Sequence, residues 1–142
     1  MIIAVSLLMQ SPGKYSSSVR PTTNPNLVTP SGVRTFDLAL EAHDLALATN
    51  PERTGKTIAR LDTLRLTLMS LKASSIVKQH KTDHEISIQT VSGHVAIHTE
   101  LERVDLPTGR VAVLERDVVH DIEAHADSAI LITVCVSPMV SS

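Results

Sequence analysis

Aromatic side chains are almost missing from this chain of 142 residues. Tyr15 and Phe36 are the only two, and tryptophan is absent. The core must therefore be built from Val, Ile, Leu and Ala, and the chain offers no row of rings on which nucleobases could stack. The formal net charge of -2 at pH 7 gives no excess of positive charge to attract a phosphate backbone. We therefore expect no nucleic-acid partner.

Long apolar runs and paired cysteines are missing as well. No apolar run approaches the roughly 18 residues that a membrane-spanning helix needs, so we expect no membrane partner and a cytoplasmic protein. The single cysteine, Cys135, cannot form an internal disulfide. It lies in the apolar segment 129–136, and we expect it to be buried as a small hydrophobic residue.

Residues 1–33 differ in composition from the rest of the chain. They contain no acidic residue and four of the 7 prolines, together with many Ser, Thr and Asn. Such a segment buries little apolar surface, so we expect a disordered N-terminal tail. A targeting peptide or a start codon placed too far upstream would explain the same composition. Residues 34–138 should form one domain.

One helix is expected near the start of this domain, over residues 37–49. Leu38, Ala42 and Leu45 recur there at helical spacing, and Asn50-Pro51 ends the pattern. No second helical pattern follows, which argues against parallel βαβ units.

From Gly55 onward, short runs of Val, Ile, Leu and Thr alternate with brief polar turns. Many short strands at this spacing are typical of a β-sandwich or a β-barrel. We therefore expect an all-β domain with strands near 56–61, 63–71, 74–80, 85–92, 94–99, 102–106, 110–114, 118–124 and 129–136.

Alternation of side chains along the fourth predicted strand identifies an inward face. Ile86 and Ile88 should point into the barrel. If the strand continues backwards without a bulge, the same alternation places Thr82, His84 and His80 inward as well.

The same reasoning applied near the C-terminus puts Val118, His120 and Ile122 on one inward face. His80, His84 and His120 can then converge inside the barrel. Three imidazoles are a plausible ligand set for zinc, iron, nickel, copper or manganese. The alternative is that they are ordinary histidines at strand ends near the mouth of a barrel.

The spacing around Gly93 resembles the first motif of the cupin superfamily. That motif reads Gly, five residues, His-x-His, three or four residues, Glu, six residues, Gly. With Gly93 as the last position, His80 falls on the first histidine and Thr82 on the second. Ile86 then falls on the glutamate and Ser74 on the leading glycine.

The second cupin motif reads Gly, five residues, Pro-x-Gly, two residues, His. Gly109 and His120 match it, whereas Glu115 and Asp117 stand at the Pro and Gly positions. The chain is thus similar to small single-domain bacterial cupins with a degenerate metal motif. The resemblance implies a double-stranded β-helix, or jelly-roll barrel, and commonly a homodimer.

The departures from the motifs bear on function. Of the usual cupin metal ligands only His80 and His120 remain, and His84 could supply a third. The resemblance therefore favours a small cupin-domain protein that binds a small-molecule ligand or a loosely held divalent metal. The predicted pocket residues are Thr82, Ile86, Ile88 and Val118.

Two alternatives stay open from the sequence. One is a metal-dependent enzyme of the dioxygenase or isomerase type that uses His80, His84 and His120. The other is a dimeric scaffold with a vestigial pocket. No residue can be assigned a catalytic role, and no organic cofactor is expected.

Overall fold

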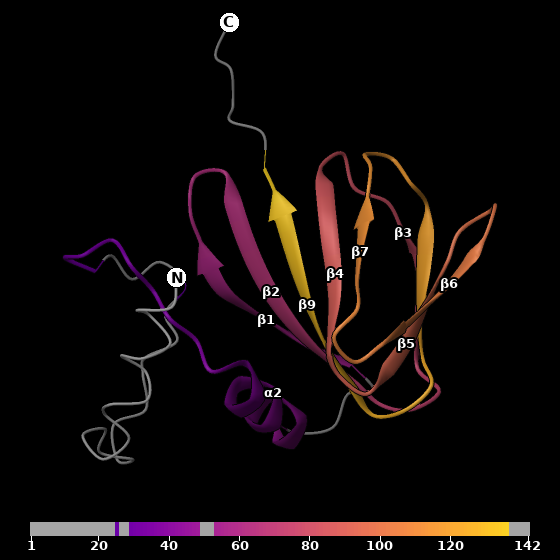
Figure 1. Ribbon diagram of the computed structural model, residues 1–142, viewed down its shortest axis with the longest axis horizontal. Helices are drawn as coiled ribbons and strands as arrows, with labels where there is room; N and C mark the ends of the chain where they lie inside the picture. The colour runs from indigo at the N-terminus through magenta and orange to yellow at the C-terminus, as the bar shows by residue number, and fades with distance from the viewer. Residues whose placement is uncertain (1–24, 26–28, 49–52, 137–142) are drawn as a thin grey trace, which may run out of the picture.

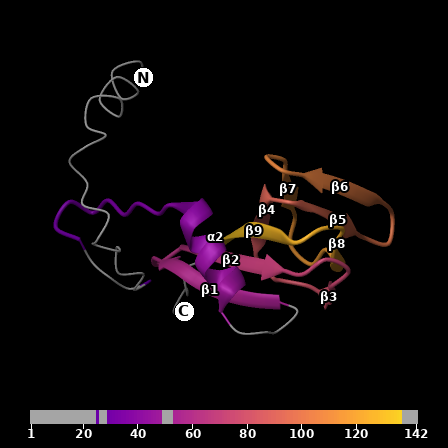
Figure 2. The same cartoon turned by 90° about the horizontal axis from the view of Figure 1, so that it is seen from below.

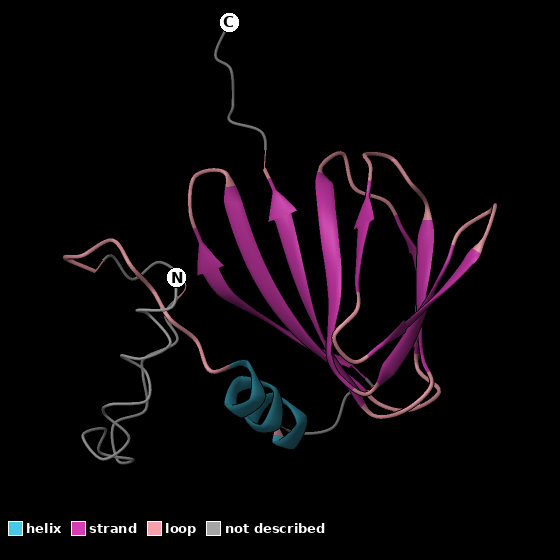
Figure 3. Cartoon of the chain, viewed as in Figure 1, coloured by secondary structure: helices cyan, strands magenta, loops and turns pink. Residues whose placement is uncertain are grey.

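The computed structural model describes residues 25, 29–48 and 53–136. They form one helix and nine strands (Figure 3), and each predicted strand overlaps an observed one. The tail predicted over 1–33 lies largely outside the described residues. The elements are α2 Leu38–Leu47, β1 Arg53–Arg60, β2 Leu64–Leu71, β3 Ile76–His80, β4 Glu85–Ser92, β5 His94–His98, β6 Arg103–Pro107, β7 Val111–Leu114, β8 His120–Ala124 and β9 Ser128–Cys135.

The strands form two antiparallel sheets. One has the order β1-β2-β9-β4-β7 and the other the order β3-β8-β5-β6. The sheets face each other, converge at one end and spread apart at the other (Figure 1). We call these the closed end and the open end. The all-β jelly-roll prediction is confirmed. No helix among the described residues is long and apolar enough to cross a bilayer.

The main core lies between the two sheets. Its side chains are aliphatic, as the lack of aromatic residues requires, and Ile88, Val95 and Ile130 are fully buried. Burial of such side chains is the main driving force for folding. The members of this core are Leu71, Val77, Ile86, Ile88, Val95, Ile97, Leu106, Leu114, Ile122, Ala124 and Ile130.

A second core lies on the outer face of the five-stranded sheet, where α2 packs (Figure 2). Asp37 caps the helix by accepting a hydrogen bond from the backbone N–H of Leu40 at 3.1 Å. Leu45 packs with Leu68 of β2 in this core. Because this face is covered, the alternate residues of β2, including Arg65, face the interior of the barrel.

Two turns adopt the left-handed conformation that normally requires glycine. Ser74 has φ 71° and Asp117 has φ 65°, and they are the two non-glycine residues with positive φ in the described part of the chain. Both stand where the cupin motifs have glycine. The backbone at both positions thus has a conformation that glycine adopts most readily.

The prediction for Cys135 was wrong, because this residue is exposed. It is the last residue of β9 and pairs with Leu64 and Glu85, the first residues of β2 and β4. The thiol therefore lies at the rim of the open end. Residues earlier in β9, such as Ile130, are covered from both faces of the sheet.

Candidate ligand-binding site

A cavity of about 500 Å³ opens between the sheets at the open end. Its walls are apolar and its rim is polar. The apolar lining consists of Met69, Val77, Ile86, Ile88, Ile122, Ile132 and Val134. The polar lining consists of Arg65, His80, Lys81, Thr82, Asp83, His84 and His120.

The three predicted histidines all line this cavity. His80 ends β3 and His120 begins β8, and the two are register partners with ring centroids 6.3 Å apart. His120 is buried, whereas His80 is exposed. The Nδ1–H of His120 donates to the carbonyl oxygen of Val118 at 3.0 Å, since a carbonyl can only accept. The Nε2 of a neutral His120 ring is then left as an acceptor.

The histidines meet for a different reason from the one predicted. Residues 81–84 do not continue β4 as a strand, because the chain crosses there from one sheet to the other. The Thr82 hydroxyl accepts a hydrogen bond from the backbone N–H of His84 at 2.8 Å and donates to its carbonyl at 3.1 Å. This local turn positions His84 at the rim.

Metal binding at this cavity depends on how its polar side chains are placed. No group of three or more His, Cys, Asp or Glu side chains in the described ranges is placed to hold a metal ion. Ile86 is buried at the position of the carboxylate. The Thr82 hydroxyl is engaged with the backbone, and the Nε2 of His84 lies 3.3 Å from Asp83 Oδ1.

Two buried polar atoms at the rim have no hydrogen-bond partner within the described structure. They are the Nε of Arg65 and the Nδ1 of His84. An unsatisfied buried donor or acceptor costs roughly 1–3 kcal/mol. Because both residues line the same cavity, a bound molecule could satisfy both atoms.

Arg65 was not among the site residues predicted from the sequence. Residues 64–71 alternate so that Leu64, Leu66 and Leu68 share one face, which looks like the core face, while Arg65 shares the other. The leucine face packs toward α2 instead, and the face with Arg65 lines the cavity. The helix predicted over 37–49 was the available signal, because a helix can cover the outer face of a sheet.

Three of the four predicted pocket residues, Thr82, Ile86 and Ile88, line the cavity. Val118 does not line it. It lies in the loop before β8, so the alternation that places His120 inward does not extend to it. Val118 packs against the other side of the core and lines a separate depression with Ile97 and Val104.

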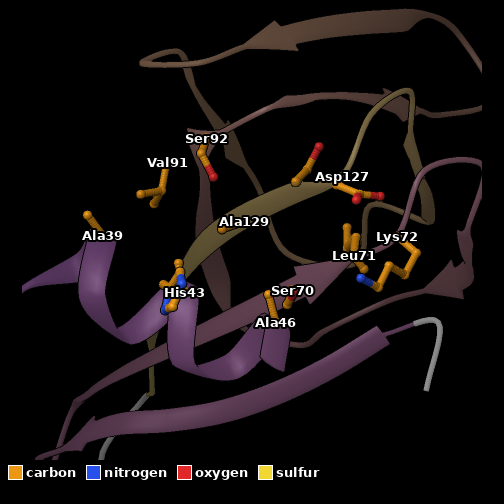
Figure 4. Close-up of a pocket in the computed structure, with 12 residues that line it drawn as sticks. Ala39, His43, Ala46, Ser70, Leu71, Lys72, Val91, Ser92, Asp127 and Ala129 are labelled. Carbon is orange, nitrogen blue, oxygen red and sulfur yellow. The ribbon is translucent and has the colours of Figure 1, made fainter. Parts of the chain in front are cut away.

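A further depression of about 290 Å³ lies between α2 and the closed-end termini of β2, β4 and β9 (Figure 4). Its walls are mainly small side chains from the helix and the strands. Two of its polar groups already have partners: Asp127 Oδ1 accepts from the Ala73 N–H at 2.9 Å, and the Ser128 hydroxyl donates to Ala126 O at 2.7 Å. The open-end cavity is therefore the better candidate site.

No protein-family model matches the sequence, and no curated protein does either. Solved structures with the same fold do match. A cupin superfamily protein from Desulfitobacterium hafniense is 16% identical, with TM-score 0.59 over 63% of this chain and 83% of that one. KdgF from Halomonas sp. is 19% identical, with TM-score 0.58 over 62% of this chain and 83% of that one.

A protein from Thermus thermophilus is 16% identical, with TM-score 0.64 over 75% of this chain and 100% of that one. At these identities the likeness shows the fold alone. The chain has the fold of cupin superfamily proteins, as the two motifs that contain Gly93 and Gly109 predicted.

Proposed function

We propose that this cupin-fold chain binds a small organic molecule in its open-end cavity, through its own side chains. The observation that carries the proposal is the cavity itself, which combines apolar walls with unpartnered polar atoms at its rim. Its volume of about 500 Å³ falls in the usual range for small-molecule sites. The apolar walls favour a ligand with an apolar body, and the rim groups would orient it.

Two loops frame the entrance to this cavity. The backbone N–H of Asp117 donates to the carbonyl of Thr82 at 2.8 Å, which ties the loop before β8 to the crossing at 81–84. Arg116 and Glu85 lie 4.0 Å apart at the same end. These contacts support a preformed rim, and a preformed site binds without a large ordering cost.

A titration followed by NMR tests the proposal, with hexanoate, hexanamide and 1-hexanol as probes. We expect at least one probe to shift the methyl signals of Ile88 and Ile132, which line the cavity. Ile132→Trp should abolish these shifts by filling the cavity. The matched control is Leu101→Trp, which enlarges a side chain that is 95% exposed in the β5–β6 turn, away from the cavity lining, and should leave these shifts unchanged. The proposal fails if no probe moves these methyl signals.

Weak metal binding is a second candidate function for the same cavity. His80 and His120 alone would hold a divalent cation weakly. A metal-dependent dioxygenase or isomerase would also need His84, whose Nε2 faces Asp83 instead. We expect metal far below one ion per chain after purification without a chelator, and no change in a His80→Ala/His120→Ala variant. Near-stoichiometric metal that is lost in this variant would favour the enzyme over the proposal.

We further propose that the chain forms a homodimer, as its resemblance to cupins implies. The strand β7 is an edge of the five-stranded sheet, and it exposes Val111 and Val113. An edge strand with exposed apolar side chains is suited to pairing with a second copy. Light scattering should give twice the chain mass, and Val113→Lys should lower it. A monomeric mass for the unmodified chain would contradict this proposal.

A further inference from the structure

We infer that the ligand of the open-end cavity is an organic acid, and that the guanidinium of Arg65 binds its carboxylate. This inference rests on the proposed small-molecule function and adds the chemical class of the ligand. It is carried by the position of Arg65, by its lack of a partner and by the charges around it.

Arg65 lies at the polar, outer end of the cavity, and the inner end is apolar. Arg65 pairs with Val134, which in turn pairs with Ile86, so these three form one row across the sheet near the strand ends. The next inward row contains Ile132 and Ile88. A carboxylate at Arg65 would therefore leave the rest of the molecule against aliphatic walls.

The guanidinium of Arg65 has no charged partner in the described part of the chain. Its Nε is buried without a hydrogen bond, and no carboxylate there lies within ion-pair distance. An arginine stays charged in proteins, and its planar fork of N–H donors matches the two oxygens of a carboxylate. A partly buried, uncompensated positive charge is costly unless an anion binds beside it.

The other groups around the cavity leave this positive charge in excess. The lining contains Arg65 and Lys81 as cations and Asp83 as the one carboxylate. The side chain of Asp83 is 85% exposed and lies 3.3 Å from His84 Nε2. The buried Nδ1 of His84 is the second unpartnered atom, and it can donate to an anion when it carries a proton.

The lining also limits the kind of acid. No aromatic ring other than the histidines is present to stack on a flat ligand, because the chain has no Phe, Tyr or Trp after Phe36. One unpartnered guanidinium suits one carboxylate. The chemistry therefore favours a small aliphatic monocarboxylic acid.

Hexanoate and hexanamide test this inference, because they share shape and differ in charge. We expect hexanoate to bind roughly tenfold or more tightly than hexanamide, as charge-assisted hydrogen bonds predict. Arg65→Gln should weaken hexanoate binding by roughly ten- to a hundredfold and leave hexanamide binding nearly unchanged. Arg65→Lys keeps the charge but loses the planar fork, so its affinity should lie in between.

The matched control is Arg110→Gln, which makes the same change on an exposed arginine of the β6–β7 turn. It should leave hexanoate binding unchanged. The melting temperature of each variant shows that it is folded. Hexanamide binding as tightly as hexanoate would overturn the organic-acid assignment while the small-molecule function stands. Binding of neither hexanoate nor hexanamide would overturn the organic-acid assignment, and the small-molecule function would fall with it if 1-hexanol also fails to bind. An equal loss of hexanoate affinity in Arg110→Gln would overturn the specific role of Arg65, because overall charge would then explain the effect.

Discussion

The two ends of this barrel differ in whether they hold buried polar atoms without a partner, within the described residues. At the closed end, the hydroxyl of Thr90 donates to Leu106 O at 2.9 Å, and that of Ser75 donates to Lys72 O at 2.6 Å. At the open end, Arg65 Nε and His84 Nδ1 are buried without partners in the described structure. The same aliphatic core runs between the two ends.

The difference separates the part of the barrel that stabilises the fold from the part available for binding. Groups that are satisfied within the chain contribute to stability, and groups left unsatisfied reduce it until a ligand binds. Removing a satisfied polar group at the closed end should therefore destabilise the chain. Removing an unsatisfied polar group at the open end should be neutral or stabilising.

Gly93→Ala should have the largest effect. Gly93 has φ 86°, and a Cβ there would lie 2.5 Å from the Asp127 carbonyl oxygen and closer still to the Ser128 hydroxyl. The clash and the backbone strain together should lower the free energy of unfolding by about 3 kcal/mol or more. Urea denaturation measures this.

Gly109→Ala is the matched control for that substitution. Gly109 has φ 90°, but nothing lies within 4 Å of its would-be Cβ. Only the conformational cost of about 1–2 kcal/mol should remain. Equal losses of unfolding free energy in the two variants would show that the close contact between Gly93 and residues 127 and 128 does not affect stability.

Thr90→Val should come next. Thr90 is fully buried, and the substitution keeps the side-chain shape while removing the hydroxyl that donates to Leu106 O. We expect a loss of about 1–2 kcal/mol in the free energy of unfolding. An unchanged denaturation midpoint would show that this hydrogen bond is not part of what stabilises the closed end.

Arg65→Met should act in the opposite direction. It removes the buried N–H that lacks a partner and keeps an unbranched chain beside Val134, the register partner of Arg65. In the absence of ligand we expect a gain of up to about 1 kcal/mol in stability. A clear loss of stability would mean that Arg65 is part of the structural core, and the contrast between the two ends would fall.

Asp117→Gly should have the smallest effect. Asp117 is exposed and has φ 65°. Glycine relieves the backbone strain of the folded state at such a position, but it also raises the conformational entropy of the unfolded chain, which offsets part of the gain. We expect a net stabilisation of about 0.5 kcal/mol by thermal denaturation. Asp62→Gly, at an exposed turn without positive φ, should destabilise slightly instead. The reverse order would argue against the glycine-like turn.

Much of the architecture could be predicted from the residues. The alternation in 85–92 placed Ile86 and Ile88 inward, and both are buried. The spacing back from Gly93 placed Ser74 at the leading glycine of the first motif, and the backbone of Ser74 has positive φ, although a strand was predicted to begin there. These predictions depend on local patterns, and strand periodicity and turn geometry are local properties.

The composition of the site was only partly predictable. His80, His84 and His120 meet at one cavity, but they meet because the chain crosses between sheets at 81–84. Val118 lies elsewhere, since it precedes β8. Where the chain crosses between sheets, the alternation of inward and outward side chains is interrupted. The inward face of one strand therefore cannot be inferred from that of the next.

The sequence by itself determined that this protein is an aliphatic β-barrel with histidines near one end. The order of apolar and polar residues predicted the strands, because each strand must bury its apolar side, and the resemblance to the two cupin motifs implied the barrel. Only the tertiary structure decided which polar groups remain without partners. Arg65 faces the cavity because α2 covers the opposite side of β2, and that depends on how distant elements pack together.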